Sequence, residues 1–212
     1  FFQFSRKINI RLWLSMHDIT PRVNATKVVT YVHNPAPFYK FKIRDLYFSP
    51  TFAFFVLFYK YIYLWGINKN DYLVVQQLWM KNQFDVLAPN VRKIVSKPEV
   101  TKKMYSNRSK ELVRSDDIKG CFFYQTFSRP FKKIEGFLKL AEFFYLLDYL
   151  SFKFYLTLTG KENNYSRWLF KKFGHLPNIV WLGKVNRAQV FNLYEQSDCL
   201  IFTSHLETWG LP

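Results

Sequence analysis

Apolar runs and amphipathic segments alternate through the second half of the chain. The run GCFFYQTF (120–127) predicts a buried strand, and residues 152–160 alternate apolar and polar positions as a half-buried strand does. Shorter apolar runs at 178–183 and 198–203 predict two more strands. Between the strands, the pattern predicts helices over 132–148, 163–173 and 186–197. This alternation indicates a parallel sheet covered by helices on both faces.

The first half is less regular. Residues 27–32 and 71–76 read as buried strands. Between them, 46–66 is almost wholly apolar and aromatic, and its length fits a membrane span. Because Pro50 lies near its start and Lys60 in its middle, we favour a helix buried in a domain interior, with a membrane-surface helix as the second choice.

The stretch 90–119 is charged and polar, which is typical of the end of one domain and the link to the next. We therefore place a domain boundary near residue 118. This predicts an N-terminal Rossmann-like domain over 1–118 and a C-terminal one over 119–212, both incomplete, in a chain that we expect to be truncated at each end.

Composition narrows the class of protein. Hydrophobic residues make up 49% of the 212 residues, which excludes a disordered chain. Cys121 and Cys199 have no metal-ligand spacing and lie in apolar runs, so we expect both to be buried, reduced thiols. The formal charge of +16 favours an anionic partner, such as nucleic acid, acidic lipid or a phosphorylated small molecule.

Polar or charged residues, and one glycine, follow five of the predicted strands. Ligands of open α/β sheets bind beyond the carboxyl ends of the strands, so these residues are candidates for a site. They are His33 and Asn34, then Gln76 and Gln77, then Ser128, Arg129, Lys132 and Lys133, then Gly160, Lys161, Glu162 and Asn163, and finally Thr203, Ser204, His205 and Glu207.

Two chemistries stand out among these candidates. Arg129 and Lys132 come at a strand–helix junction, where cations and a helix N-terminus suit a diphosphate. Glu207 follows a predicted strand and is suited to accept hydrogen bonds from sugar hydroxyls. Each residue alone also fits a structural role: Arg129 as a surface cation, Glu207 as a first-turn acid, and His33 as a partner of a loop carbonyl.

Several segments carry a resemblance to a known family. SHLETWGLP resembles the first part of the E-x7-E signature of retaining nucleotide-sugar glycosyltransferases of family 4. FSRPFKKIEG resembles their Arg…Lys phosphate-binding turn, and VVTYVHNPAPFY resembles the histidine-bearing strand end of their first domain. The bacterial polysaccharide-assembly type is the most similar. The resemblance implies a GT-B fold, in which two Rossmann-like domains face each other, the first binding the acceptor and the second the donor.

The resemblance also implies roles for residues. Arg129 and Lys132 would hold the diphosphate, with Lys133 able to share this role, Glu207 would contact the donor sugar, and His33 would lie at the transferred sugar. Donor contacts would further involve Gly160, Glu162, Asn163, Ser204 and the segment Thr208, Trp209, Gly210 and Leu211, whereas Asn34 and Gln76 would lie on the acceptor side with His33. Transfer would retain configuration without an essential metal or cofactor.

Expected partners follow from the resemblance: a UDP- or GDP-sugar, a glycan or lipid-linked acceptor, and an anionic membrane face, with no nucleic acid. The protein would be cytoplasmic and peripheral on the inner side of the membrane. The second glutamate of the signature would lie beyond Pro212 and the glycine-rich loop before Phe1, so we expect this chain to be inactive alone. Two alternatives stay open. One is a basic nucleic-acid-binding or membrane-surface-binding α/β module without catalysis, and the other is a protein that spans a membrane through 46–66.

Overall fold

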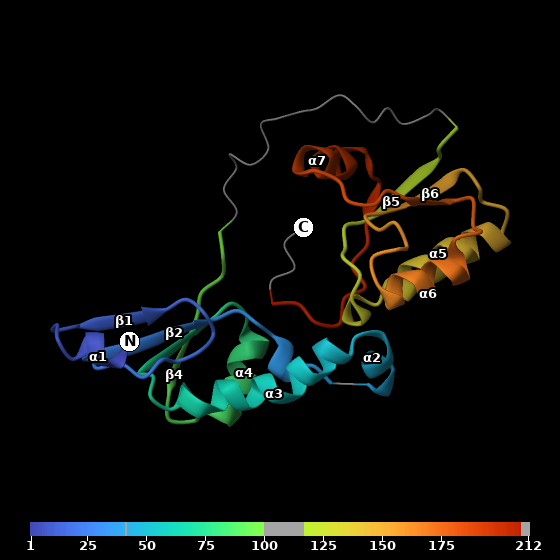
Figure 1. The fold of residues 1–212 in the computed structure, drawn as a ribbon. Helices are drawn as coiled ribbons and strands as arrows, with labels where there is room; N and C mark the ends of the chain where they lie inside the picture. The colour runs from blue at the N-terminus through green and yellow to red at the C-terminus, as the bar shows by residue number, and fades with distance from the viewer. Residues whose placement is uncertain (41, 100–116, 209–212) are drawn as a thin grey trace. The chain divides into compact units, whose positions relative to one another are not determined.

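The computed structural model describes residues 1–40, 42–99 and 117–208, which form two compact units (Figure 1). Among the described residues, the first unit comprises 1–40, 42–46, 50–99 and 206–208, and the second comprises 47–49 and 117–205. Each unit contains a four-stranded, wholly parallel sheet. The predicted domain boundary near 118 directly follows an interval outside the described residues and stays a prediction.

The sheet of the first unit has the strand order β1-β2-β3-β4. The predicted strands 27–32 and 71–76 are confirmed as β2 (Lys27–Val32) and β3 (Tyr72–Val75) in its centre. The edge strands β1 (Leu12–Ser15) and β4 (Arg92–Val95) were not predicted; β4 lies in the stretch 90–119 that we interpreted as the end of one domain and the link to the next. Both edge strands are short and leave most side chains at least partly exposed, so neither produces a buried apolar run.

Two helices of the first unit, α3 (Pro50–Ile67) and α4 (Leu78–Leu87), contribute to the core on its sheet. The unit also contains α1 (Phe2–Ser5), a 3-10 turn at Ala36–Phe38, and α2 (Ile43–Phe48), whose last two residues belong to the second unit. Pro50 is the first residue of α3, where its missing N–H is not needed, so it starts the helix rather than interrupting it. The core joins strand residues Val32, Leu73 and Val75 to Tyr63 of α3 and Phe84 of α4.

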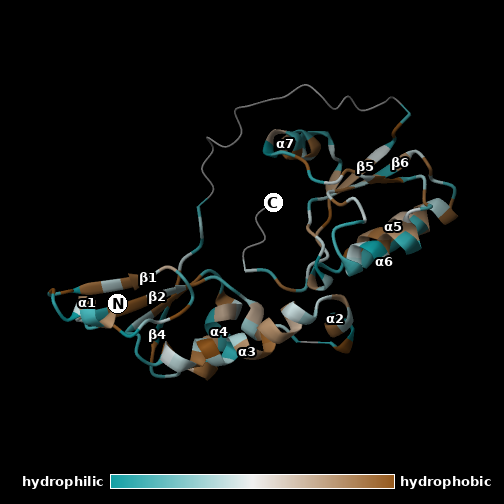
Figure 2. Cartoon of the chain, viewed as in Figure 1, coloured by the Kyte–Doolittle hydropathy of each residue, from teal (hydrophilic) through white to brown (hydrophobic). Residues whose placement is uncertain are grey.

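Our prediction that 46–66 forms a helix in a domain interior was wrong for one side of that helix. Ala53, Val56, Tyr63 and Ile67 of α3 are buried, but most of its other apolar side chains are exposed. Figure 2 shows hydrophobic residues along α3. In the described part of the chain, α3 is the one helix long and apolar enough to cross a membrane, judged by length and composition alone.

The second unit matches the predicted alternation. Its strand order is β7-β6-β5-β8, formed by Ile179–Trp181, Phe152–Leu156, Gly120–Tyr124 and Cys199–Leu200 respectively. Figure 1 shows α5 (Ile134–Leu146) and α6 (Asn164–Phe173) on one face of the sheet and α7 (Arg187–Gln196) on the other. Each strand is shorter than its apolar run, because the run continues into the loop that follows the carboxyl end.

The two cysteines differ in burial. Cys121 on β5 is buried, as predicted, but the prediction was wrong for Cys199, which is exposed. Cys199 belongs to β8, an edge strand of two residues that are both exposed. An apolar run therefore did not guarantee burial at the sheet edge.

Candidate functional site

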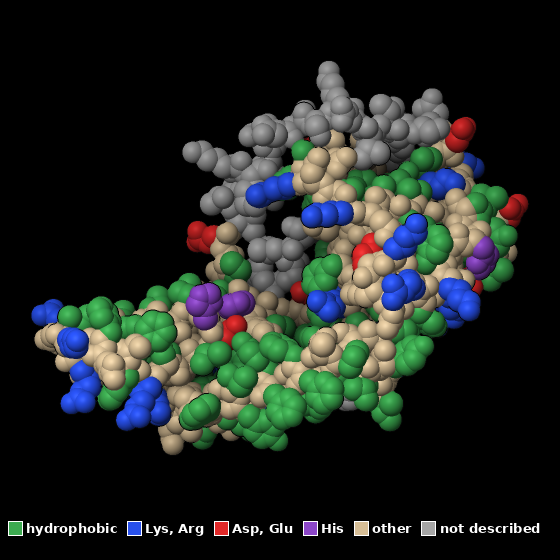
Figure 3. Space-filling model, in the orientation of Figure 1, with side chains coloured by type: hydrophobic (Ala, Val, Ile, Leu, Met, Phe, Trp, Pro, Cys, Tyr) green, Lys and Arg blue, Asp and Glu red, His purple; other side chains and the backbone are tan. Residues whose placement is uncertain are grey.

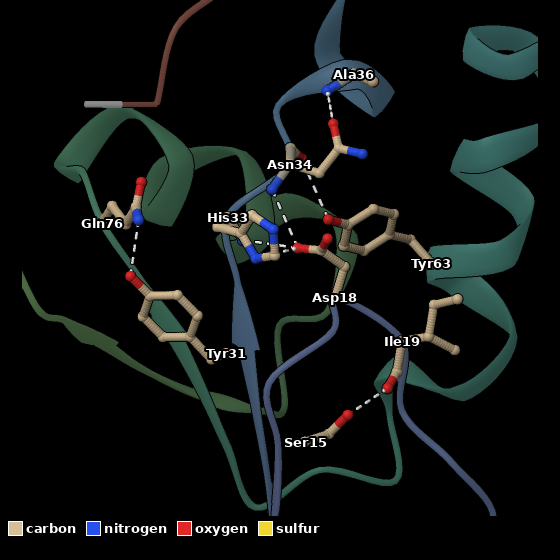
Figure 4. A network of polar contacts seen from close by, with 9 residues as sticks. All are labelled: Ser15, Asp18, Ile19, Tyr31, His33, Asn34, Ala36, Tyr63 and Gln76. Atoms are coloured by element: carbon tan, nitrogen blue, oxygen red, sulfur yellow. Dashed lines mark hydrogen bonds and ion pairs between the residues drawn. The ribbon is translucent and has the colours of Figure 1, made fainter. Parts of the chain in front are cut away.

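The carboxyl ends of β2 and β3 bring His33, Asn34 and Gln76 to one edge of the first sheet, because these strands are parallel neighbours. Gln76 Nε2 donates a 2.7 Å hydrogen bond to the Tyr31 hydroxyl (Figure 4). The ring of Tyr31 stacks on the His33 imidazole with a centroid distance of 6.0 Å. Asn34 Oδ1 accepts from the Ala36 amide at 3.0 Å, which closes an Asx turn. The structure thus gathers all three residues assigned to the acceptor side.

A buried carboxylate, Asp18, holds this strand end and was missed by the sequence reasoning. Its Oδ1 accepts hydrogen bonds from the backbone amides of His33, at 2.7 Å, and Asn34, at 3.0 Å. The same oxygen lies 3.3 Å from Nδ1 of His33 (Figure 4). Asp18 itself adopts a left-handed backbone with φ of 56°. One carboxylate therefore orients both the main chain and the imidazole of His33.

Two tyrosines of α3 lie near this carboxylate. The Tyr63 hydroxyl donates a 3.1 Å hydrogen bond to the carbonyl of Asn34. Burial, followed by the negative charge of Asp18, raises the pKa of Tyr63 far above its ordinary value, and the same two causes raise the pKa of Tyr59. Tyr63 thus stays a neutral donor over the working pH range. A sequence signal for Asp18 existed, since it follows the short run LWLS as the other polar groups follow their strands.

In the second unit, the loop after β5 is tied to the loop after β6. The Thr126 amide donates to Thr157 Oγ1 at 2.8 Å, and that hydroxyl donates back to the Thr126 carbonyl at 2.6 Å. Ser128 Oγ donates to Asn163 Oδ1 and Asn163 Nδ2 donates to the Ser128 carbonyl, both at 2.8 Å. Asn163 also caps α6 by accepting from the Ser166 amide at 3.0 Å. The side chain of Asn163 thus has a structural function at this edge.

Hydroxyl groups fix the main chain between β5 and α5. The carbonyl of Lys132 accepts from the Tyr124 hydroxyl at 2.7 Å and from Thr203 Oγ1 at 2.9 Å. Thr203 Oγ1 also lies 2.7 Å from the carbonyl of Lys133, whose backbone is left-handed with φ of 50°. The His205 amide donates to the Phe131 carbonyl at 2.9 Å. The segment that contains Ser204 therefore lies against the loop that carries the lysines.

Three cations follow β5 on this loop. The Lys132 ammonium lies 4.8 Å from the centre of the Phe127 ring, a cation–π distance. Arg129 is exposed, and its guanidinium forms no hydrogen bond or ion pair within the described residues. The loop leads directly into α5, whose first amides add partial positive charge. Such a group of cations beside a helix N-terminus is suited to a phosphorylated ligand.

The loop after β6 has tight local geometry. Gly160 has φ of 83°, and a Cβ there would come within 2.5 Å of Phe170. Glu162 Oε1 accepts from the Thr159 amide at 2.5 Å and from the Thr159 hydroxyl at 2.8 Å. Burial alone would raise the pKa of Glu162, but these hydrogen bonds outweigh it and lower the pKa below its ordinary value. Gly160 and Glu162 therefore shape this loop, whatever else they contact.

The C-terminal acid belongs to the first unit, whereas the cation loop belongs to the second. Glu207 and Thr208 are partly buried, and the described residues from Leu206 onward group with the first unit rather than with Arg129. Trp209, Gly210 and Leu211 lie outside the described residues. Their expected donor contacts stay predictions.

Comparisons with known proteins bear on the fold. No protein-family model and no curated protein matches the sequence. Among solved structures, TarM of S. aureus has a TM-score of 0.58 and 17% identity over 87% of this chain and 33% of its own. A trehalose-6-phosphate synthase has a TM-score of 0.58 and 15% identity over 86% of this chain and 48% of its own. The pneumococcal O-GlcNAc transferase GtfA has a TM-score of 0.54 and 13% identity over 98% of this chain and 40% of its own.

These similarities define the class of fold. The chain has two Rossmann-like, parallel-sheet α/β regions of the GT-B type, as the sequence predicted. It spans between a third and a half of the length of the three structures compared. At identities of 17% or less, the shared fold is what the comparison shows, so activity has to be argued from the site.

Proposed function

We propose that this chain is part of a glycosyltransferase that moves a sugar from a nucleotide-diphosphate donor to a glycan or lipid-linked acceptor with retention of configuration. The observation that carries the proposal is the loop between β5 and α5, where an exposed arginine and two lysines precede a helix N-terminus. Structures with the same fold were solved with UDP, namely TarM and GtfA, and the trehalose-6-phosphate synthase is described as acting with retention.

The cations account for the chemistry of the leaving group. When the bond between the sugar and the diphosphate breaks, negative charge develops on the diphosphate. Arg129 and Lys132, with Lys133 sharing the role, would neutralise this charge from fixed positions, which replaces the metal ion used by other transferases. Because Tyr124 and Thr203 hold the carbonyls of this loop, little reorganisation is needed as the charge develops.

We assign roles to the remaining residues from the resemblance to retaining nucleotide-sugar glycosyltransferases. His33 would lie at the transferred sugar, Asn34 and Gln76 would contact the acceptor, and Glu207 would accept hydrogen bonds from donor hydroxyls. The loops that contain Gly160, Glu162, Asn163 and Ser204, together with the amides of Thr208, Trp209, Gly210 and Leu211, would surround the nucleotide and its phosphates.

Calorimetric titration with UDP and with GDP tests the proposal on a chain extended to its natural termini. The Arg129→Ala variant should bind the preferred nucleotide at least about tenfold more weakly, which is the loss expected for one charge-assisted hydrogen bond. Lys171→Ala is the matched control, because Lys171 is an exposed cation in the last turn of α6. Equal binding by the wild-type and Arg129→Ala proteins, or no binding of either nucleotide, would contradict the proposed donor site.

A further inference from the structure

A pocket lies between the loops that precede β1 and β2 in the first unit. Its volume is about 200 Å³. It is lined by Ile8, Asn9, Ile10, Asn24, Ala25 and Thr26. Because β1 and β2 are parallel neighbours, both begin beside this pocket, whereas Asp18 and His33 follow their carboxyl ends. We call it the amino-edge pocket, and it is separate from the residues assigned to the acceptor side.

Hydrogen bonds hold the two walls of this pocket in place. The Thr26 amide donates to the carbonyl of Ile10 at 2.9 Å, which joins one loop to the other. The Asn24 amide donates to Ser5 Oγ at 2.8 Å, and Ser5 is fully buried in α1. The pocket is thus formed by the fold itself, so a ligand would bind without the conformational cost of building it.

Several polar groups at the pocket have no hydrogen-bond partner within the described residues. They are the backbone amides of Asn9 and Ala25, the carboxamides of Asn9 and Asn24, and the hydroxyl of Thr26. Most of the exposed lining is polar. These groups are therefore available to a polar ligand, whereas an apolar ligand would leave them unpaired.

The chain around the pocket is positively charged. Neither residues 1–17 nor residues 19–27 contain an aspartate or glutamate. The basic residues of these two stretches are Arg6, Lys7, Arg11, Arg22 and Lys27. Asp71 also lies beside β2, but its carboxylate already accepts from Lys27 Nζ at 2.7 Å and from the Val28 amide at 2.9 Å. Figure 3 shows Lys and Arg side chains at the end of the first unit where β1 begins. A pocket in such surroundings attracts anions.

Two of these cations are free to contact a ligand. The guanidinium carbons of Arg6 and Arg22 lie 5.8 and 4.5 Å from the centre of the Phe2 ring, so both arginines already have a cation–π partner. Lys7 and Arg11 flank the lining segment 8–10 in sequence and are exposed. Neither forms an ion pair in the part of the chain that the structure describes. Lys7 and Arg11 are therefore the cations available to an anion in the pocket.

We infer that the amino-edge pocket binds a small molecule that carries a phosphate group. A phosphate offers negative charge and several acceptor oxygens, which match the unpaired amides and the two free cations. The volume lies below the range of about 300–1,000 Å³ that is usual for sites of drug-sized ligands, so the ligand is compact. The inference does not rest on glycosyl transfer, because the pocket and His33 lie at opposite edges of the sheet.

Calorimetric titration of the 212-residue chain at constant ionic strength tests the inference. The probes are inorganic phosphate, glycerol 3-phosphate and, as the uncharged counterpart, glycerol. We expect both phosphates to bind and glycerol to give no heat of binding. Tighter binding of glycerol 3-phosphate would support a pocket that also holds the organic part of its ligand, whereas equal binding would support recognition of the phosphate group alone.

Two variants address the pocket directly. Ala25→Phe places a ring in the pocket and should abolish phosphate binding. Lys7→Ala with Arg11→Ala should weaken phosphate binding at least about tenfold, since charge-assisted contacts are lost. The matched control, Lys40→Ala with Lys42→Ala, removes the same charge from the segment that follows the carboxyl end of β2 and should bind as the wild type does.

Hydrogen-exchange mass spectrometry locates the bound phosphate without depending on the folding of Ala25→Phe. Saturating phosphate should slow exchange in peptides over 8–12 and 24–28, because a ligand that bridges these loops makes them open less often. The Arg129→Ala variant should show the same protection, since its substitution lies in the proposed donor loop. Failure of the donor site and failure of this pocket are thus separate results.

Four outcomes would overturn the inference. The first is the absence of binding of either phosphate at millimolar concentrations. The second is equal phosphate binding by the wild type and the variant that lacks the Lys7 and Arg11 cations. The third is protection confined to 124–133, because the phosphate would then occupy the proposed donor loop. The fourth is binding of glycerol as tight as that of glycerol 3-phosphate, because hydroxyl groups rather than phosphate would then be recognised.

Discussion

The strand ends of β2 and β5 present functional groups in different ways. After β2, a buried carboxylate from another loop fixes both the backbone and the imidazole of His33. After β5, neutral hydroxyls of Tyr124 and Thr203 fix only the backbone, and the Arg129 side chain extends into solvent. The first loop is thus organised around one side chain, and the second around the path of its main chain.

This difference fits the two kinds of ligand that we propose. A residue beside the transferred sugar benefits from one fixed orientation, because small displacements are costly in rate. A cation that holds a diphosphate acts over a longer range, so the position of its backbone matters more than one exact side-chain orientation. The comparison therefore predicts that mutations of the supporting residues affect the two loops unequally.

The largest effect is expected for Asp18→Ala. Loss of this carboxylate leaves two partly buried amide donors without this partner, which should reduce the local stability of the loop at 33–36 by about 2 kcal/mol. Hydrogen-exchange mass spectrometry of peptides over 27–36 measures this loss. Asp18→Asn, which keeps an acceptor oxygen, should lose roughly a third as much. An unchanged exchange rate in Asp18→Ala would mean that the carboxylate does not hold the loop.

An intermediate effect is expected at the second loop. Ser128→Ala removes one partly buried hydrogen bond to Asn163 and should cost about 1 kcal/mol, measured by hydrogen exchange over 124–133. Arg129→Ala, next in sequence, should change exchange by less than about 0.5 kcal/mol, because its side chain is exposed. The contrast between the loops would fail if Arg129→Ala destabilised this loop as much as Ser128→Ala.

The smallest effect is expected for Glu162→Gln. Because hydrogen bonds lower the pKa of Glu162 in the folded state, its charge contributes stability above the unfolded pKa, and this contribution is lost as pH falls through the folded pKa. The carboxylate is exposed, so the contribution should stay below about 0.5 kcal/mol. Thermal melts should show Glu162→Gln less stable than the wild type at pH near 7 and equal to it near pH 3. A difference that grows toward low pH would contradict the sign.

Much of the fold could be predicted because the central strands β2, β3 and β5 keep at least every second side chain buried. The run KVVTYV became β2 with the predicted bounds, and GCFFYQTF contained β5. The edge strands β1, β4 and β8 carried weak or misleading signals, since edge residues are exposed and burial does not select their composition. Cys199 was misjudged for this reason.

The sequence predicted which residues lie at the candidate site, but not which residues hold them in place by hydrogen bonds. The rule that ligands lie beyond strand ends selected His33, Asn34 and Gln76, and the structure brings them to one edge. Asp18 was missed although it follows the short run LWLS, because that strand was not recognised and the partners of the carboxylate are backbone amides, which have no sequence signature. The pairing of Ser128 with Asn163 joins residues 35 positions apart and likewise depends on the register of β5 and β6.

Local periodicity and chain order are enough to specify the alternation of strands and helices, the parallel sheets and the cations placed after β5. Tertiary packing is needed to specify which side of α3 is buried, since that helix is apolar on most sides and has no polar face to mark its outside. Tertiary packing also decides that Asp18 orients His33. Such a contact depends on two strands meeting in one sheet, and local sequence does not encode that meeting.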